Sequence, residues 1–179
     1  QLKIFIDIAS LAATSIDKAR LFAETNVRAR QLGVLNDISR QLVAAEGDLE
    51  GLLNFITSSA VDILNAEAGS LLLTVDDGSR DLEFRVAVGG SGQEIIGTRI
   101  PAGRGLVGEV ASKGQVVIVN DARNDPRWGG EFGKGKFQTN NVLAVPLTTQ
   151  DRVIGVLEVL NKRYAGAFNP EDAGLLTTF

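Results

Sequence analysis

Apolar residues recur at helical spacing through about the first 45 residues of the chain. Ile16, Ala23, Val27, Val34 and Ile38 are separated by seven or four positions, and charged residues fill the intervals. This pattern predicts one long helix with a narrow apolar stripe. A helix with so little apolar surface is not stable alone in water, so the stripe must pack against another helix or a core.

The stripe has two candidate partners, and Gly33 marks the expected bend between them. Leu35, Ile38 and Leu42 are expected to pack on the core of the domain that follows. For residues 12–30 we favour a parallel homodimeric coiled coil, because apolar residues at heptad spacing are typical of such pairs. Packing on the domain's own core remains the alternative for this segment.

From residue 48 onward the pattern changes to short helices and strands. Asp48 is a suitable N-cap for a helix over 49–65, and Asn169 followed by Pro170 predicts the start of a last helix. Tight turns join most neighbouring strands, which favours an antiparallel sheet, so the fold class is α+β with helices on one face of the sheet and loops on the other. The predicted strands are 70–75, 81–87, 98–100, 115–120, 141–147 and 153–160, with a short helix over 103–113.

Residues 121–140 form a long polar segment between two predicted strands, with glycines at 129, 130, 133 and 135. A loop of this length inside a compact domain usually carries function, typically as a lid or a binding loop. We therefore expect this 121–140 loop to border a binding site.

Composition excludes several classes of function. The chain has no cysteine and no histidine, so it cannot build a thiolate nucleophile, a Cys/His zinc site or a Ser-His-Asp triad. The net charge is -4 with no basic cluster, which argues against a nucleic-acid partner. No apolar run is long enough to span a bilayer, so no membrane partner is expected, and the absence of cysteine fits a cytoplasmic location.

One motif is misleading. Gly103, Gly105 and Gly108 match the dinucleotide-binding fingerprint, and Asp121 follows at the end of the next predicted strand. The context does not fit, because Pro101 interrupts the preceding strand and the helix is too short for a crossover. We interpret these glycines as a loop that leads into a helix whose first amides face a cavity, where an anion could still bind.

Three segments of the chain match a known family pattern. They are the turn 100–108, the strand and loop 114–126, and the set Asn161, Lys162, Phe168 and Asp172. Together these segments resemble the GAF domain of cyclic-nucleotide phosphodiesterases, bacterial adenylyl cyclases and many bacterial sensor proteins, over residues 35–179. The resemblance implies a GAF-type sheet with a ligand pocket under the loops of one face. It also implies a structural role for the third segment, in which a Lys162–Asp172 ion pair would tie the last helix to the sheet.

The resemblance also implies ligand contacts. By position in the family pattern they are Ser70, Leu106, Val107, Thr139 and Glu158, and the aromatic residues Trp128, Phe132 and Phe137 of the 121–140 loop are added as stacking candidates. Ser70 could instead merely begin a strand, and Leu106 and Val107 could serve the core. The family's purine-binding Phe-Asp pair is replaced by Gly89-Gly90, and an acidic residue and a threonine of the family's lid appear as Phe132 and Gly135. Together these losses are expected to weaken nucleotide binding by about two decades or more.

The predicted organisation is the end of a preceding domain with a signalling helix over residues 1–34, then a GAF domain over 35–179. The expected function is a regulatory small-molecule sensor, with a cyclic nucleotide or another small ligand, that relays its state through flanking helices to an output domain of a longer signalling protein. The alternative is a ligand-free GAF module that serves dimerisation. An enzyme is not expected, since the sulfoxide-reductase branch of the family depends on cysteines.

Overall fold

Residues 48–178, apart from 91, 129–136, 151 and 165, are described by the computed structural model of the chain. All of them belong to one compact unit, Ala45–Phe179. The predicted N-terminal helix, its coiled coil, the bend at Gly33 and the boundary after residue 34 lie outside the described residues and stay predictions.

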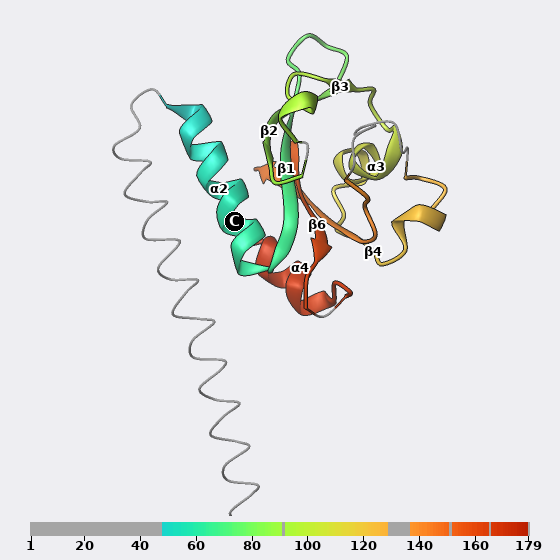
Figure 1. The fold of residues 1–179 in the computed structure, drawn as a ribbon. Helices are drawn as coiled ribbons and strands as arrows, with labels where there is room; N and C mark the ends of the chain where they lie inside the picture. The colour runs from blue at the N-terminus through green and yellow to red at the C-terminus, as the bar shows by residue number, and fades with distance from the viewer. Residues whose placement is uncertain (1–47, 91, 129–136, 151, 165, 179) are drawn as a thin grey trace, which may run out of the picture. The chain divides into compact units, whose positions relative to one another are not determined.

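A six-stranded antiparallel sheet forms the centre of this unit, which confirms the predicted fold class (Figure 1). The strand order is β3-β2-β1-β6-β5-β4, so the two longest strands, β1 and β6, lie side by side in the middle. The strands are β1 (Ala66–Thr74), β2 (Leu82–Val88), β3 (Arg99–Ile100), β4 (Val117–Val119), β5 (Val142–Thr149) and β6 (Arg152–Lys162).

The helices cover both faces of the sheet, which corrects the expectation that they all lie on one face. Helices α2 (Leu49–Ile63) and α4 (Pro170–Leu176) pack on one face, and α3 (Gly105–Lys113) packs on the other (Figure 1). Two short 3-10 turns, Gly92–Ile95 and Ala122–Asn124, lie in segments that the sequence pattern assigned to loops.

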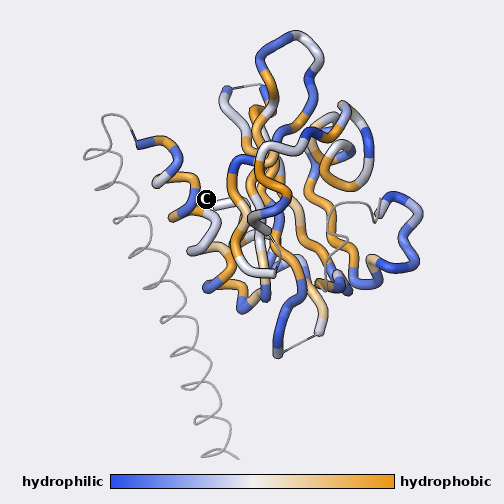
Figure 2. Tube along the Cα trace, turned by 45° about the horizontal axis from the view of Figure 1, so that its top comes forward, coloured by the Kyte–Doolittle hydropathy of each residue, from blue (hydrophilic) through white to orange (hydrophobic). Residues whose placement is uncertain are grey.

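Alternation along the strands divides the interior into two cores. Leu71 and Leu157 face the α2 side, whereas their neighbours Leu72 and Val156 face the α3 side. Figure 2 shows the result, with hydrophobic positions concentrated along the strands and hydrophilic ones in the connecting loops. Because both faces of the sheet are covered, the sequences of the central strands are nearly continuous apolar runs.

The predicted helix caps are present. The Asp48 carboxylate accepts a hydrogen bond from the Gly51 N–H at 2.8 Å, and the Asn169 side chain accepts from the N–H groups of Glu171 and Asp172. Asp172 in turn accepts from the Asn169 N–H, which completes a capping box. None of the helices in the described part of the chain is both long and apolar enough to cross a membrane.

Candidate functional site

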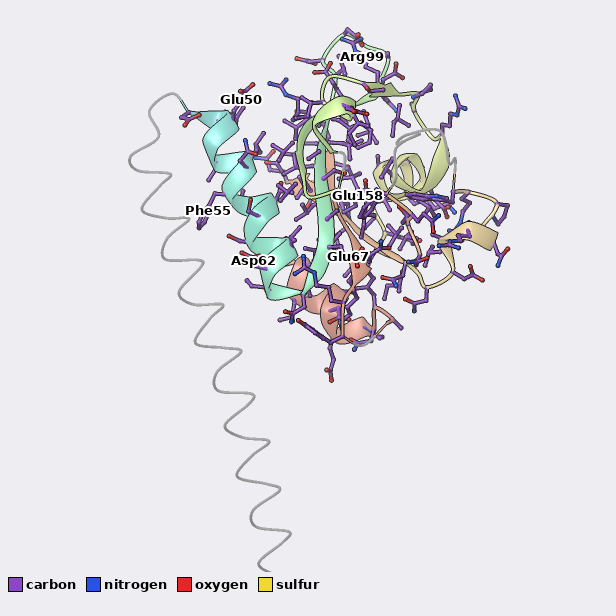
Figure 3. The ribbon with its side chains drawn as sticks, viewed as in Figure 1. Glu50, Phe55, Asp62, Glu67, Arg99 and Glu158 are labelled. Atoms are coloured by element: carbon purple, nitrogen blue, oxygen red, sulfur yellow. The ribbon has the colours of Figure 1, made fainter. Side chains whose placement is uncertain are left out.

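Ser70 and Glu158 form a buried polar pair at the centre of the sheet. They lie directly opposite each other on β1 and β6, and the Ser70 hydroxyl donates a hydrogen bond of 2.5 Å to Oε1 of Glu158. Both side chains face the α3 side of the sheet, because their neighbours Leu71 and Leu157 face the α2 side. Figure 3 shows Glu158 in the interior of the domain.

Burial changes the acidity of Glu158. The residue is only 5% exposed, and this desolvation raises the pKa of its carboxyl from 4.5 to about 7, against a smaller lowering by the Ser70 hydrogen bond. Near neutral pH the side chain therefore exchanges between a protonated form that can donate and an ionised form that accepts. It can pair with either kind of group on a ligand.

The start of α3 forms a second wall of the site. Gly103 and Gly105 have φ values of 74° and 71°, a left-handed conformation that favours glycine and turns the chain sharply into the helix. The first helical side chains, Leu106 and Val107, are buried and belong to the core on this face. They serve the core and border the site at once, so the two sequence-based readings of this pair are compatible.

Residues 126–128 supply a third wall, and an ion pair fixes this segment to α3. The Arg127 guanidinium binds Asp125 at 2.7 Å and Glu109 of α3 at 3.0 Å. The same guanidinium holds the pKa of the Asp125 carboxyl at about 2. Trp128 follows directly and its side chain is half-buried, so the Arg127 contacts position this aromatic residue beside the helix.

These walls enclose a cavity of about 280 Å³ on the α3 face of the sheet. This volume is near the lower end of the range for small-molecule sites. Apolar side chains dominate its lining, and the Ser70–Glu158 pair is one of its few polar features. Of the residues predicted as ligand contacts, the cavity brings together Ser70, Leu106, Val107, Trp128, Thr139 and Glu158, while Phe132 lies outside the described residues.

Sequence reasoning missed several lining residues, and Phe84 shows why. Along β2 the alternation suggests that Phe84 and Val86 share one face, yet Phe84 lies in the α3-side core and Val86 in the other. The pairing of β1 with β2 shifts there, leaving Arg85 as an extra residue. Such a bulge reverses the facing of every later side chain and leaves no reliable mark in the sequence.

Of the residues predicted to be structural, Lys162 lies in β6, Asp172 in α4 and Phe168 just before α4. Lys162 Nζ lies 2.6 Å from Asp172 Oδ2, with the two side chains 14% and 9% exposed, so the pair ties β6 to α4. Phe168 is buried, and the Asn120 side chain binds both its N–H and its carbonyl oxygen. Polar contacts therefore hold Phe168 and the start of α4 against the rest of the domain.

Asn161 has a role that the sequence did not reveal, because it clamps the end of the 121–140 loop. Its Nδ2 donates to the Gln138 carbonyl oxygen at 2.8 Å, and its Oδ1 accepts from the Asn140 N–H at 2.7 Å. Its own backbone is left-handed, with φ of 57°. Because Thr139 lies between the two clamped groups, Asn161 fixes the backbone that presents Thr139 to the cavity.

The sequence matches one family model and a curated relative. A family model described as GAF domain matches residues 46–179. The chain is 28% identical over 176 residues to the dual 3',5'-cyclic-AMP and -GMP phosphodiesterase 11A of Takifugu rubripes, covering 93% of this chain but only 19% of that protein's length.

Solved structures share the fold. The GAF domain of a phosphoenolpyruvate-protein phosphotransferase from Coxiella burnetii superposes with a TM-score of 0.70 at 24% identity, covering 84% of this chain and 88% of that one. The free methionine-R-sulfoxide reductase of Neisseria meningitidis gives a TM-score of 0.61 at 26% identity, with coverages of 83% and 86%. The match of the family model over most of the chain, together with the sheet order and the cavity, shows that this chain belongs to the GAF domain family.

Proposed function

We propose that this chain is a regulatory module that binds a small molecule in the cavity on the α3 face and relays the bound state to an output domain of a longer signalling protein. The observation that carries the proposal is the buried Ser70–Glu158 pair inside an otherwise apolar cavity. Burying a carboxyl group costs free energy, and an acid with a strongly raised pKa in a pocket is typical of a functional site.

A cyclic nucleotide is the first ligand to test. The relative from Takifugu rubripes is named for cyclic AMP and cyclic GMP, and the cavity offers groups that suit such a molecule. Apolar and aromatic side chains line most of it, Glu158 and Thr139 can hydrogen-bond to a polar edge, and the first amides of α3 can face a phosphate.

The proposed role is regulatory and not catalytic. The chain has neither cysteine nor histidine, so the cavity contains no thiol and no imidazole to act as nucleophile or base. Ligand binding would act instead by favouring one of two conformations of the flanking helices. The equilibrium between the two conformations shifts by the difference in the ligand's binding free energy for them.

A thermal-unfolding scan with cyclic AMP, cyclic GMP, nucleobases and free amino acids, each at millimolar concentration, tests the proposal. A ligand at about 100 times its Kd should add about 2.7 kcal/mol of stability and raise Tm by a few degrees. Glu158→Ala should abolish the shift, whereas the exposed Glu94→Gln should not. If no compound of this panel shifts Tm, the ligand-free dimerisation role replaces the sensor role.

The proposed homodimer is tested separately, by light scattering on the whole chain. The apolar stripe predicts a parallel dimer, and Val27→Glu places a charge within that stripe and should give a monomer. A wild-type chain that is monomeric at high concentration would contradict this part of the proposal.

A further inference from the structure

Two consecutive glycines follow β2 at the rim of the cavity, and an aromatic ring lies against the second. Gly89 and Gly90 have φ values of 74° and 56°. A Cβ atom added to Gly90 would lie 2.9 Å from Cδ2 and 3.0 Å from Cγ of Phe137. The Phe137 ring therefore rests on the Gly90 backbone at a distance that no larger residue would permit.

This ring has surface available for a ligand. Phe84, Trp128 and Phe137 all line the cavity, but Phe84 is buried in the core at 3% exposure. Phe137 and Trp128 are half-buried, so part of each side chain faces open space. An aromatic face that is partly exposed within a cavity is a platform on which another flat ring can stack.

The backbone that carries Phe137 is fixed independently of any ligand. The next residue, Gln138, is held through its carbonyl oxygen by Asn161, and Asn140 is held by the same side chain. The ring thus lies against Gly90, and the residues that follow it in the chain are held in place. A stacking group that is already in place loses little conformational entropy when a ligand binds.

We propose that Phe137, seated on Gly90, is the specificity-determining stacking residue of this cavity, and that its ligand presents a flat nitrogen heterocycle with a polar edge. The heterocycle of the ligand would stack on the Phe137 side chain. Its polar edge would form hydrogen bonds with Ser70 and Glu158, which can donate or accept. This inference rests on the proposed small-molecule function and adds the chemical class of the ligand.

Trp128 provides the measurement. It is the only tryptophan of the chain and it lines the cavity, so its fluorescence should respond to occupancy. Cyclic AMP and cyclic GMP are titrated beside a methyl riboside 3',5'-cyclic phosphate, which keeps the sugar and the phosphate but lacks the base. At least one cyclic nucleotide should bind, and the baseless probe should bind at least about tenfold more weakly.

Substitution of Phe137 separates stacking from simple filling of space. Phe137→Ala should weaken binding of the cyclic nucleotide by about tenfold to a hundredfold, whereas Phe137→Tyr, which keeps the ring, should stay within about threefold of the wild type. Urea unfolding without ligand checks that each variant is folded.

A double-mutant cycle tests the contact with Gly90. Gly90→Ala forces a methyl group into the Phe137 ring and should weaken binding about as much as Phe137→Ala. In the Phe137→Ala background the same change should have little further effect, because the ring that it displaces is absent. Backbone strain from the positive φ is present in both backgrounds and cancels in the cycle.

The outcomes distinguish the two proposals. If a cyclic nucleotide binds but Phe137→Ala leaves its Kd within about twofold, or if the baseless probe binds equally well, the stacking inference is wrong and the sensor function stands. The same holds if free amino acids bind and no ring compound does. If nothing in the panel binds to the wild-type chain, both proposals fail.

Discussion

Replacing Glu158 by glutamine should change how the stability of the domain depends on pH. Glutamine keeps the size of the side chain and can still accept the Ser70 hydroxyl, but it cannot ionise. In the folded chain burial raises the pKa of Glu158 from 4.5 to about 7. At about 1.4 kcal/mol per unit, this difference amounts to about 3 kcal/mol.

The direction follows from which state holds the proton. Between pH 4.5 and about 7 the unfolded chain has lost the Glu158 proton while the folded chain retains it. Stability therefore falls as pH rises through this window, and the full loss is present above the pKa of the folded chain. Below pH 4.5 both states are protonated, and the Glu158 contribution no longer varies with pH.

Urea unfolding of the wild type and of Glu158→Gln at several pH values measures the effect. The difference in free energy of unfolding between the two should move by about 3 kcal/mol in favour of the variant from about pH 4.5 to about pH 8. Taking the difference removes the titration of all other groups. Glu94→Gln, at an exposed position, is the control variant. A Glu158→Gln difference that stays constant with pH would refute the reasoning that burial perturbs this carboxyl group.

Two further predictions concern the ion pair between β6 and α4 and the contact of β1 with α2. In urea unfolding at neutral pH, Lys162→Met should cost about 3 kcal/mol, because it leaves the Asp172 carboxylate, 9% exposed, without its cation. Lys113→Met, in an exposed helix pair, should cost far less, and equal losses would contradict this. Gly69→Ala should lower the free energy of unfolding by about 1–3 kcal/mol, because its Cβ would lie 2.7 Å from an α2 side chain. Gly174→Ala, with open space around it in α4, should instead raise the free energy of unfolding by up to about 1 kcal/mol. A tolerated Gly69→Ala would show that α2 can move away from the sheet.

The sequence predicted well those features that depend on local chemistry. The caps at Asp48 and Asn169 are present because a short polar side chain before a helix satisfies free N–H groups wherever it occurs. The Lys162–Asp172 pair was predictable because both residues belong to a family motif. The strand boundaries were predicted less well: β1 begins at Ala66, four residues before the predicted start at residue 70. That early segment pairs with β6, a long-range contact that the local pattern does not reveal.

Features that depend on contacts between distant segments could not be predicted in this way. The extra residue at Arg85 turns Phe84 toward the cavity, although alternation would place it with Val86. The clamp formed by Asn161 depends on a left-handed backbone at that residue and on the path of the 121–140 loop. Neither condition is visible in the residue types alone.

The Gly89-Gly90 pair shows how a substitution that suggests a lost function can have another cause. Compared with the family pattern, the two glycines remove an aromatic residue and predict a weakened nucleotide site. In the structure a Cβ at Gly89 would collide with the Glu67 carbonyl oxygen, and a Cβ at Gly90 would collide with the Phe137 ring. The glycines are therefore required by the local backbone and by a ring that comes from another segment. Trp128 and Phe137 of the 121–140 loop supply aromatic surface at the cavity in place of the family's phenylalanine. The absence of the family pair is therefore not by itself an argument for an empty site.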